Sequence, residues 1–177
     1  DDGSEFVIKN YNKNTIVIRN NMNRGKGYSL NKAFNYAYNN GYTHAITMDA
    51  DSQHDPKYID QFLKIDSNIC LVIGERKFNK KMPFARKFSN IITSFIISRL
   101  TNTMILDSQS GFRRYNLSII NDLSCLENGY QYESEILIKL LNKNCSIKNI
   151  YIPTIYGNEV SYINKFVDSL MFIRLII

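Results

Sequence analysis

The ten residues Ala45-Ile46-Thr47-Met48-Asp49-Ala50-Asp51-Ser52-Gln53-His54 decide how this chain is interpreted. An apolar run that stops at two carboxylates one residue apart is typical of a buried strand that delivers acids to its C-terminal end. Carboxylate oxygens suit Mg²⁺ or Mn²⁺, and such ions usually bind one or two protein carboxylates together with substrate phosphates. The stretch therefore indicates nucleotide-diphosphate chemistry rather than a metal cage built by the protein alone.

Asp49 and Asp51 also have purely structural interpretations. An aspartate at a strand end is often a turn former or a helix cap, but Asp55 followed by Pro56 already fits the cap of the next helix. A calcium loop would place acids at similar spacing. Its sixth position holds histidine here instead of glycine, and its twelfth holds aspartate instead of glutamate. The metal–nucleotide interpretation and the plain strand-end interpretation both stay open from the acids alone.

Length and composition indicate one globular domain. The 177 residues suffice for a single core, and 44% hydrophobic with 21% charged residues exclude a disordered or fibrous chain. The net charge of +6 is spread along the sequence without a dense basic tract, so nucleic acid is not an expected partner, whereas anionic lipids or phosphates are. Cys70, Cys125 and Cys145 lack metal-type spacing, and we expect reduced packing residues in a cytosolic compartment. No signal peptide or apolar stretch of about 20 residues is visible.

Strand and helix patterns alternate along the chain. We expect strands at residues 15–19, 44–48, 70–73 and 147–152, and helices at about 28–39, 56–64 and 132–142. A long amphipathic helix is expected from Pro83 onward, with apolar residues at helical spacing that serve either the core or a membrane surface. Such alternation favours a parallel sheet covered by helices on both faces, with ligands at the C-terminal ends of its strands.

Two polar segments are candidate phosphate sites. Residues 23–27 (NRGKG) precede a helix and could cradle a phosphate, although they are not a Walker loop and a solvated turn is equally compatible. Residues 107–113 (DSQSGFR) end in the first of two successive arginines, Arg113 and Arg114. Arginine suits bidentate phosphate contact, although a plain surface turn is equally compatible. Glu133 and Glu135 are expected to be solvated helix charges, and His44 and His54 receive no role.

In this order, residues 1–4, 23–27, 49–54, 74–76 and 107–113 resemble the motifs of family 2 glycosyltransferases, most closely the dolichol- or polyprenyl-phosphate sugar transferases. The resemblance extends to residues 155–159 and 172–174 and covers essentially the whole chain. It implies a three-layer α/β/α, Rossmann-like GT-A fold with a mainly parallel sheet, as one catalytic domain over residues 1–177. The first strand and helix of that fold would precede Asp1, so we expect a fragment that is unstable or inactive alone. A C-terminal amphipathic helix is expected at about 161–177.

The resemblance also assigns site residues. The expected donor is a UDP- or GDP-sugar and the expected cofactor is Mg²⁺ or Mn²⁺, with Asp2 at the nucleotide base and Asp49 at the ribose or metal. The metal ligands are expected to be Asp49, Asp51 and Gln53. The expected catalytic residues are Asp107, Arg113 and Arg76, and the expected further substrate contacts are Gly25, Lys26, Arg86, Ser110 and Arg114. Direct attack on the anomeric carbon would invert its configuration.

The acceptor is expected to be a polyprenyl or dolichyl phosphate at the cytoplasmic face of a membrane. A phosphate oxygen is already ionised at pH 7, whereas a sugar hydroxyl would need a general base, for which Asp107 is the natural candidate. Three alternatives are kept. They are a family 2 transferase that acts on a sugar hydroxyl in cell-surface polysaccharide synthesis, a sugar-nucleotide nucleotidyltransferase, and a non-catalytic binding module.

Overall fold

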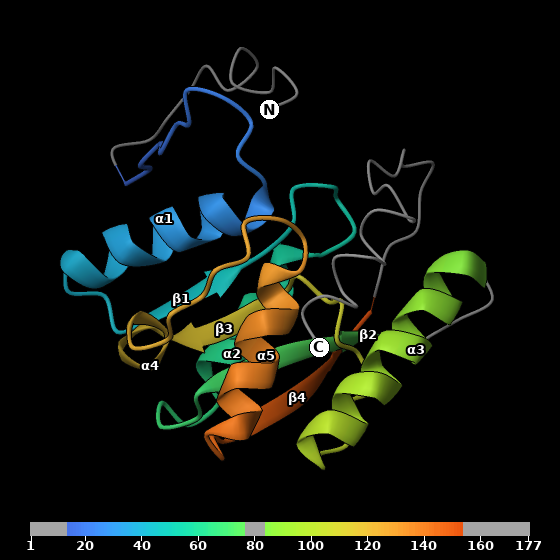
Figure 1. The fold of residues 1–177 in the computed structure, drawn as a ribbon. Coiled ribbons are helices and arrows are strands. Elements are labelled where there is room, and N and C mark those ends of the chain that lie inside the picture. The colour runs from blue at the N-terminus through green and yellow to red at the C-terminus, as the bar shows by residue number, and fades with distance from the viewer. Residues whose placement is uncertain (1–13, 77–83, 154–177) are drawn as a thin grey trace.

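The computed structural model describes residues 14–76 and 84–153, with the backbone alone for residues 84–86. The helices are α1 (Lys26–Asn39), α2 (Ile59–Leu63) with the preceding 3-10 turn η2 (Pro56–Tyr58), α3 (Phe84–Thr101), α4 (Leu117–Asn121) and α5 (Tyr132–Asn142). The strands are β1 (His44–Thr47), β2 (Leu71–Arg76), β3 (Arg113–Asn116) and β4 (Ile147–Ile152). Figure 1 shows the sheet with the helices packed around it.

The helix boundaries follow the local signals in the sequence. Helix α1 ends at Asn39, two residues before Gly41, whose φ of 81° is the left-handed conformation that glycine adopts without strain. The side chain of Asp55 accepts a hydrogen bond from the Lys57 amide, with Pro56 at the first helical position, as the predicted cap requires. Helices α1 and α5 begin and end close to the predicted ranges, and α3 begins at Phe84, directly after the Pro83 where a helix was expected to start.

The sheet is mixed, with the strand order β1-β3-β2-β4. Strands β1, β2 and β4 run in one direction, because β3 is antiparallel to both β1 and β2 while β2 and β4 are parallel. The predominance of one strand direction agrees with the expected GT-A fold. Strand β3 was not predicted: it begins at the end of the polar segment 107–113 and inserts between two strands that come before it in the chain. Its register sets Arg113 opposite both Thr47 and Ile73.

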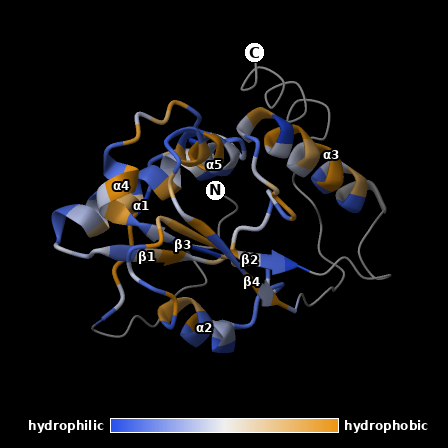
Figure 2. Ribbon diagram, turned by 90° about the horizontal axis from the view of Figure 1, so that it is seen from below, coloured by the Kyte–Doolittle hydropathy of each residue, from blue (hydrophilic) through white to orange (hydrophobic). Residues whose placement is uncertain are grey.

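The sheet separates two apolar layers, because successive residues of a strand point to opposite faces. Leu71 and Ile73 of β2 pack into the larger cluster with residues of α1, α3, α4 and α5. Val72 points the other way, into a smaller cluster with Phe62 of α2. Figure 2 shows the consequence, with α2 alone below the sheet and the other helices above it. The predicted three-layer arrangement is confirmed.

One predicted strand is wrong. Residues 15–19 have no strand pairing with any described residue, and the side chains of Ile16 and Val17 are 56% and 41% exposed. β-branched residues favour a strand only when a neighbour supplies both the ladder and a packed face. The segment therefore stays outside the sheet, and its Arg19 carbonyl accepts a hydrogen bond from Lys32 of α1. Asp2 and the expected helix at 161–177 lie outside the described residues.

Candidate functional site

The two aspartates that follow β1 lie at the end of the sheet where β3 begins. Because Thr47 pairs with Arg113, the segment before β3 runs beside the segment after β1, and the Thr47 hydroxyl donates a hydrogen bond to the Gly111 carbonyl oxygen at 2.8 Å. A Cβ atom on Gly111 would lie 2.2 Å from Oδ2 of Asp49. Glycine at position 111 therefore allows the Asp49 carboxylate to pack directly against this backbone.

The turn after Asp49 exposes a second carboxylate. Asp51 is exposed, and its Oδ1 accepts a hydrogen bond from the Gln53 amide at 3.1 Å, an aspartate turn that includes Ser52 at φ 62°. Gln53 and His54 are buried behind this turn, and burial is the main reason that the pKa of His54 is lowered. Of the expected metal ligands, Asp49 and Asp51 thus have solvent-accessible carboxylates, whereas Gln53 is 3% exposed.

Lys26, the first residue of α1, bridges two carboxylates from different elements. Its Nζ lies 2.8 Å from Oδ1 of Asp49 and 2.8 Å from Oε2 of Glu133. Burial alone would lower the pKa of Lys26, but the charges of Glu133 and Asp49 outweigh it and hold the pKa above the ordinary value. The Lys26 side chain is therefore a charged ammonium bound between α5 and the loop after β1.

The glycines on either side of Lys26 allow the backbone to pack closely against residues 128–129. A Cβ on Gly25 would lie 2.3 Å from the Asn128 carbonyl oxygen, and Gly25 also has a φ of 90°. The Gly27 amide donates to the Gly129 carbonyl at 3.2 Å, the Tyr28 amide to the Asn128 carbonyl at 3.1 Å, and the Gly25 amide to the Asn23 side chain at 3.0 Å. These three amides are committed to protein oxygens, so they do not form the expected phosphate cradle in this structure. The side chain of Lys26 is what this segment presents to the site.

Glu133 was not recognised from the sequence. We expected a solvated helix charge, which is wrong, because the residue is 7% exposed and its carboxylate is paired with Lys26. One signal could have revealed it: Glu133 precedes Ile136 and Leu137 by three and four positions, and residues at that spacing share a helix face. Both of those residues are fully buried. An acid on the apolar stripe of α5 had to be buried and needed a cationic partner.

Asp107 lies in a buried cluster at the end of β2. Its carboxylate accepts hydrogen bonds from Arg76 Nε at 2.7 Å, Arg76 Nη2 at 2.9 Å and the Arg76 amide at 3.1 Å. Two further donors are the Asn90 side chain of α3 at 2.7 Å and the Gln109 amide at 3.2 Å. Burial by itself would raise the pKa of Asp107, but hydrogen bonds and the charge of Arg76 hold it below the usual range of aspartate. The Asp107 carboxylate thus binds Arg76 of β2 and Asn90 of α3 and holds the two elements together.

Arg113 joins the segment before β3 to α5. Its guanidinium is fully buried and donates to the backbone carbonyls of Ser108, Ser110 and Glu133 at 2.6, 2.6 and 2.9 Å. Ser110, the expected substrate contact, is itself buried. Arg113 therefore sets the backbone of residues 108–110 against the first turn of α5, where Glu133 lies.

Arg114 does not reach this site. Successive strand residues point to opposite faces, so Arg113 and Arg114 cannot act side by side. The Arg114 guanidinium donates to the carbonyls of Phe62, Ile65 and Asp66 at 2.9, 2.7 and 2.6 Å, where α2 ends. The Phe62 and Asp66 carbonyls also accept the Ile65 and Ile69 amides, so the guanidinium adds donors there and opposes the negative end of the helix dipole. The side chain of Arg86, another expected substrate contact, lies outside the described residues.

The acids at the end of β1 fit a hard divalent cation. Within residues 14–76 and 84–153, no three His, Cys, Asp or Glu side chains are grouped as a ready-made metal site. Asp49 and Asp51 nevertheless offer accessible carboxylate oxygens, and one Asp49 oxygen already binds a cation, the Lys26 ammonium. This donor chemistry fits Mg²⁺ or Mn²⁺ bound jointly with a substrate phosphate.

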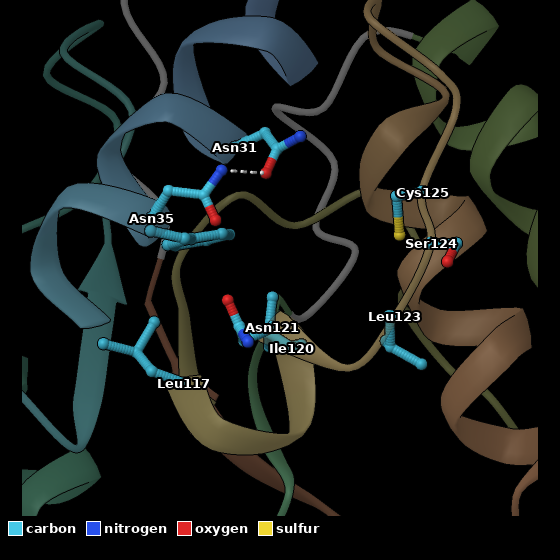
Figure 3. A pocket seen from close by; sticks show the side chains of 9 residues that line it. Asn31, Asn35, Leu117, Ile120, Asn121, Leu123, Ser124 and Cys125 are labelled. Carbon is cyan, nitrogen blue, oxygen red and sulfur yellow. Dashed lines mark hydrogen bonds between the residues drawn. The ribbon is translucent and has the colours of Figure 1, made fainter. Parts of the chain in front are cut away.

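A pocket of about 300 Å³ lies elsewhere, between α1 and the segment that contains α4. Figure 3 shows Asn31 and Asn35 on its α1 side, joined by a 3.1 Å hydrogen bond, and Asn121 and Cys125 on the other side. Helix α4 follows the last residue of β3, and β3 is antiparallel to β1. The pocket is therefore toward the opposite end of the strands from Asp49.

Helix α3 buries polar residues beside the apolar Ile97 and exposes other large apolar side chains. Asn90 and Ser94 are 0% and 4% exposed, and the Ser94 hydroxyl donates to Ser108 at 3.0 Å. On the other side, Phe88 and Phe95 are 56% and 58% exposed, with Ile91 and Ile92 between them also exposed. Within the described part of the chain, no helix is long and apolar enough to cross a membrane. Four of the exposed side chains form an apolar strip on the first part of α3 (Phe88, Ile91, Ile92 and Phe95).

Comparison with known proteins gives consistent results. A sequence model described as Glycosyl transferase family 2 matches residues 1–124. The chain is 34% identical over 149 residues to a UDP-N-acetylglucosamine–dolichyl-phosphate N-acetylglucosaminyltransferase of Methanococcus voltae, covering 80% of this chain and 59% of that protein. It is 27% identical over 111 residues to a dolichyl-phosphate hexose transferase of Haloferax volcanii, covering 61% of this chain and 48% of that protein.

A solved structure shares the fold. Glucosyl-3-phosphoglycerate synthase of Mycobacterium tuberculosis, crystallised with Mn²⁺, UDP-glucose and phosphoglyceric acid, superposes with a TM-score of 0.63 at 15% identity. The match covers 91% of this chain and 55% of that one. The chain thus spans less than two thirds of the length of each of these three proteins.

Proposed function

The chain belongs to glycosyl transferase family 2 and is a glycosyltransferase with the GT-A fold, and from that membership we propose its substrates. The donor is a nucleotide-diphosphate sugar and the acceptor is a polyprenyl or dolichyl phosphate. The reaction depends on Mg²⁺ or Mn²⁺ and inverts the anomeric carbon. The names of the Methanococcus voltae and Haloferax volcanii relatives support the acceptor, and the Mn²⁺ and UDP-glucose of the solved structure support the donor and the metal.

Asp49 and Asp51 are the residues that would hold the divalent ion, which when bound supplies positive charge to the leaving diphosphate. Gln53 stays a predicted ligand, although it is buried behind the turn. Gly111 keeps the Asp49 carboxylate in place, and Lys26 holds its other side. Arg113 fixes the backbone of Ser108 and Ser110, just before the Gly111 that lies against Asp49. The chain's own contribution is thus a set of carboxylates oriented before any ligand arrives.

The burial and hydrogen bonding of Asp107 are the observations that support a phosphate acceptor. A general base needs an accessible carboxylate with a pKa near the working pH. Asp107 accepts five hydrogen bonds, is buried, and has its pKa lowered below that of an ordinary aspartate. It is a poor base for a sugar hydroxyl. A phosphate acceptor needs no base, because its oxygen is already ionised.

A phosphate acceptor must still approach the donor diphosphate against repulsion. Two like charges at about 4 Å repel by about 4 kcal/mol at an effective dielectric of 20. Lys26, Arg76 and Arg113 are the described cations near the acids. Arg76 and Arg113 are buried and bound to protein oxygens, whereas the Lys26 side chain is 25% exposed. Lys26 is therefore the described cation best placed to offset that repulsion.

The apolar strip on α3 supports a site at a membrane surface. A helix that lies in the interface presents large apolar side chains to lipid, with basic residues alongside. Arg99 lies near Phe95, with Cζ 5.3 Å from the ring centroid, and the net charge of +6 favours an anionic surface. We place the enzyme at the cytoplasmic face of the membrane, where the polyprenyl chain would be held near Asp107 by α3.

The proposal is tested by an acceptor and donor screen with the full-length protein. Labelled UDP- and GDP-sugars are supplied with polyprenyl phosphate, or with the matched polyprenol that lacks the phosphate, with and without EDTA. Label should pass to the lipid only with polyprenyl phosphate and only without EDTA. Transfer to a sugar hydroxyl alone, or release of pyrophosphate from a nucleoside triphosphate, would replace the proposal by one of the alternative functions.

A further inference from the structure

Lys26 occupies an unusual place for a cation. It is the first residue of α1, where the helix dipole is positive and where acidic residues are favoured, and the first turn of α1 contains none. Its Nζ nevertheless lies 2.8 Å from carboxylate oxygens of both Asp49 and Glu133. The two carboxylates therefore stabilise a charge that the helix terminus disfavours.

Two backbone contacts bring this cation to the acids. A Cβ on Gly27 would lie 2.5 Å from Cβ of Tyr132, the residue before Glu133, so α1 begins against the first turn of α5. Gly111 gives the Asp49 carboxylate its room on the other side. Three segments that are far apart in the sequence thus meet at one ammonium group.

The cluster carries one positive charge against two negative ones. Glu133 Oε1 is buried and has no hydrogen-bond partner among the described residues. Asp51 adds a further exposed carboxylate two residues after Asp49. An excess of buried or partly buried carboxylate is unfavourable unless it is offset by more positive charge. Of the described cations nearby, Arg76 pairs with Asp107 and Arg113 with backbone carbonyls, so the Lys26 ammonium is the described cation that pairs with these acids, and the site can take a stronger cation.

We propose that the Lys26 ammonium is the resident counter-ion of the acid site: it holds Asp49 and Glu133 while no metal is bound, and an incoming divalent ion displaces it from Asp49. Glu133 remains as its second carboxylate partner. The displaced ammonium is then free to meet a ligand phosphate. This inference rests on the proposed metal dependence of the transferase and assigns Lys26 and Glu133 a positioning role in it.

Metal binding without nucleotide tests the competition directly. Mn²⁺ is titrated into the full-length protein and free Mn²⁺ is followed by electron paramagnetic resonance, for the wild type, Lys26→Met and Arg24→Met. Lys26→Met should bind Mn²⁺ about fivefold more tightly, a change equivalent to one partly exposed ion pair. Arg24→Met is the matched control, because it also removes a positive charge from this loop. The Arg24 guanidinium packs on a ring instead of on a carboxylate, with Cζ 4.3 Å from the centroid of Tyr28. Its affinity should stay within about twofold of the wild type.

Lysine labelling tests the same point on the unmodified protein, in case Lys26→Met does not fold. Acetylation of individual lysines is followed by mass spectrometry with and without Mg²⁺. The rate at Lys26 should rise with Mg²⁺, while that at Lys32, which donates to the Arg19 carbonyl, should not change. An unchanged or slower Lys26 rate, or Mn²⁺ affinity in Lys26→Met no tighter than in wild type, overturns the displacement. If neither protein binds Mn²⁺, even with a nucleoside diphosphate present, the metal dependence itself fails as well.

Discussion

Gly111→Ala separates the geometry of the acid site from the stability of the fold. The new Cβ would lie 2.2 Å from Oδ2 and 2.7 Å from Cγ of Asp49, far inside van der Waals contact. The obstructing atoms are the end of a side chain that is 34% exposed, so the carboxylate can rotate away at small cost. Rotation would separate Asp49 from Lys26 and from any bound cation.

The two expected effects differ in size. Losing the partly exposed Lys26–Asp49 ion pair should lower the free energy of unfolding by only about 0.2–1 kcal/mol. Residues that orient a metal ligand typically change affinity or activity by about 10- to 100-fold when they are replaced. We therefore expect kcat/KM to fall by about that factor, which corresponds to about 1.4–2.7 kcal/mol of transition-state stabilisation.

We would measure urea unfolding and sugar transfer to polyprenyl phosphate on the same preparations of the full-length protein. The first gives the free energy of unfolding and the second gives kcat/KM, for the wild type and Gly111→Ala. Gly74→Ala is the control, because its Cβ would lie 2.6 Å from Cδ1 of Ile152 and 2.9 Å from the Phe112 carbonyl, in the core. It should cost about 1–3 kcal/mol of stability with little change in kcat/KM of the folded protein. The reasoning about Gly111 is refuted if Gly111→Ala keeps kcat/KM within twofold of the wild type.

Three further substitutions follow from the same contacts. Asp107→Asn should lower the free energy of unfolding by about 3–5 kcal/mol, because it leaves the buried Arg76 guanidinium without its carboxylate. Because folding lowers the pKa of Asp107, the ionised carboxylate stabilises the fold above its ordinary pKa of 3.8, and this stabilisation is lost as the pH falls through the lower folded value. Urea unfolding between pH 5 and pH 2 should therefore show a decrease in stability in the wild type that is absent from Asp107→Asn. Arg114→Met should cost about 2–4 kcal/mol of stability, because the carbonyls of Phe62, Ile65 and Asp66 each lose a hydrogen bond from the guanidinium. The KM measured at permissive temperature should not change, and a raised KM would return Arg114 to the substrate site. The double substitution of Phe88 and Phe95 by serine should weaken flotation with anionic vesicles by at least about tenfold while the midpoint of thermal unfolding stays nearly constant, and undiminished flotation would exclude the apolar strip as the membrane contact.

The sequence by itself determined the elements whose pattern is local. Helical periodicity predicted α1, α3 and α5, short apolar stretches predicted β1, β2 and β4, and Asp55 with Pro56 predicted the start of η2. It also predicted that Asp49 and Asp51 follow directly after a strand of the sheet. Each of these features depends on residues within a few positions of one another, and such signals survive in any surroundings that bury the apolar face.

Only the tertiary structure decided which side chains meet. Strand β3 is four residues long and begins with two arginines, so nothing local distinguishes it from a loop; it exists because β1 and β2 provide ladders on both sides. That register brings Gly111 against Asp49 and sends Arg113 and Arg114 to opposite faces. The same packing buries Glu133 beside Lys26, although 106 positions separate them. Contacts between such distant residues depend on how strands pair and helices pack, which a local pattern does not encode.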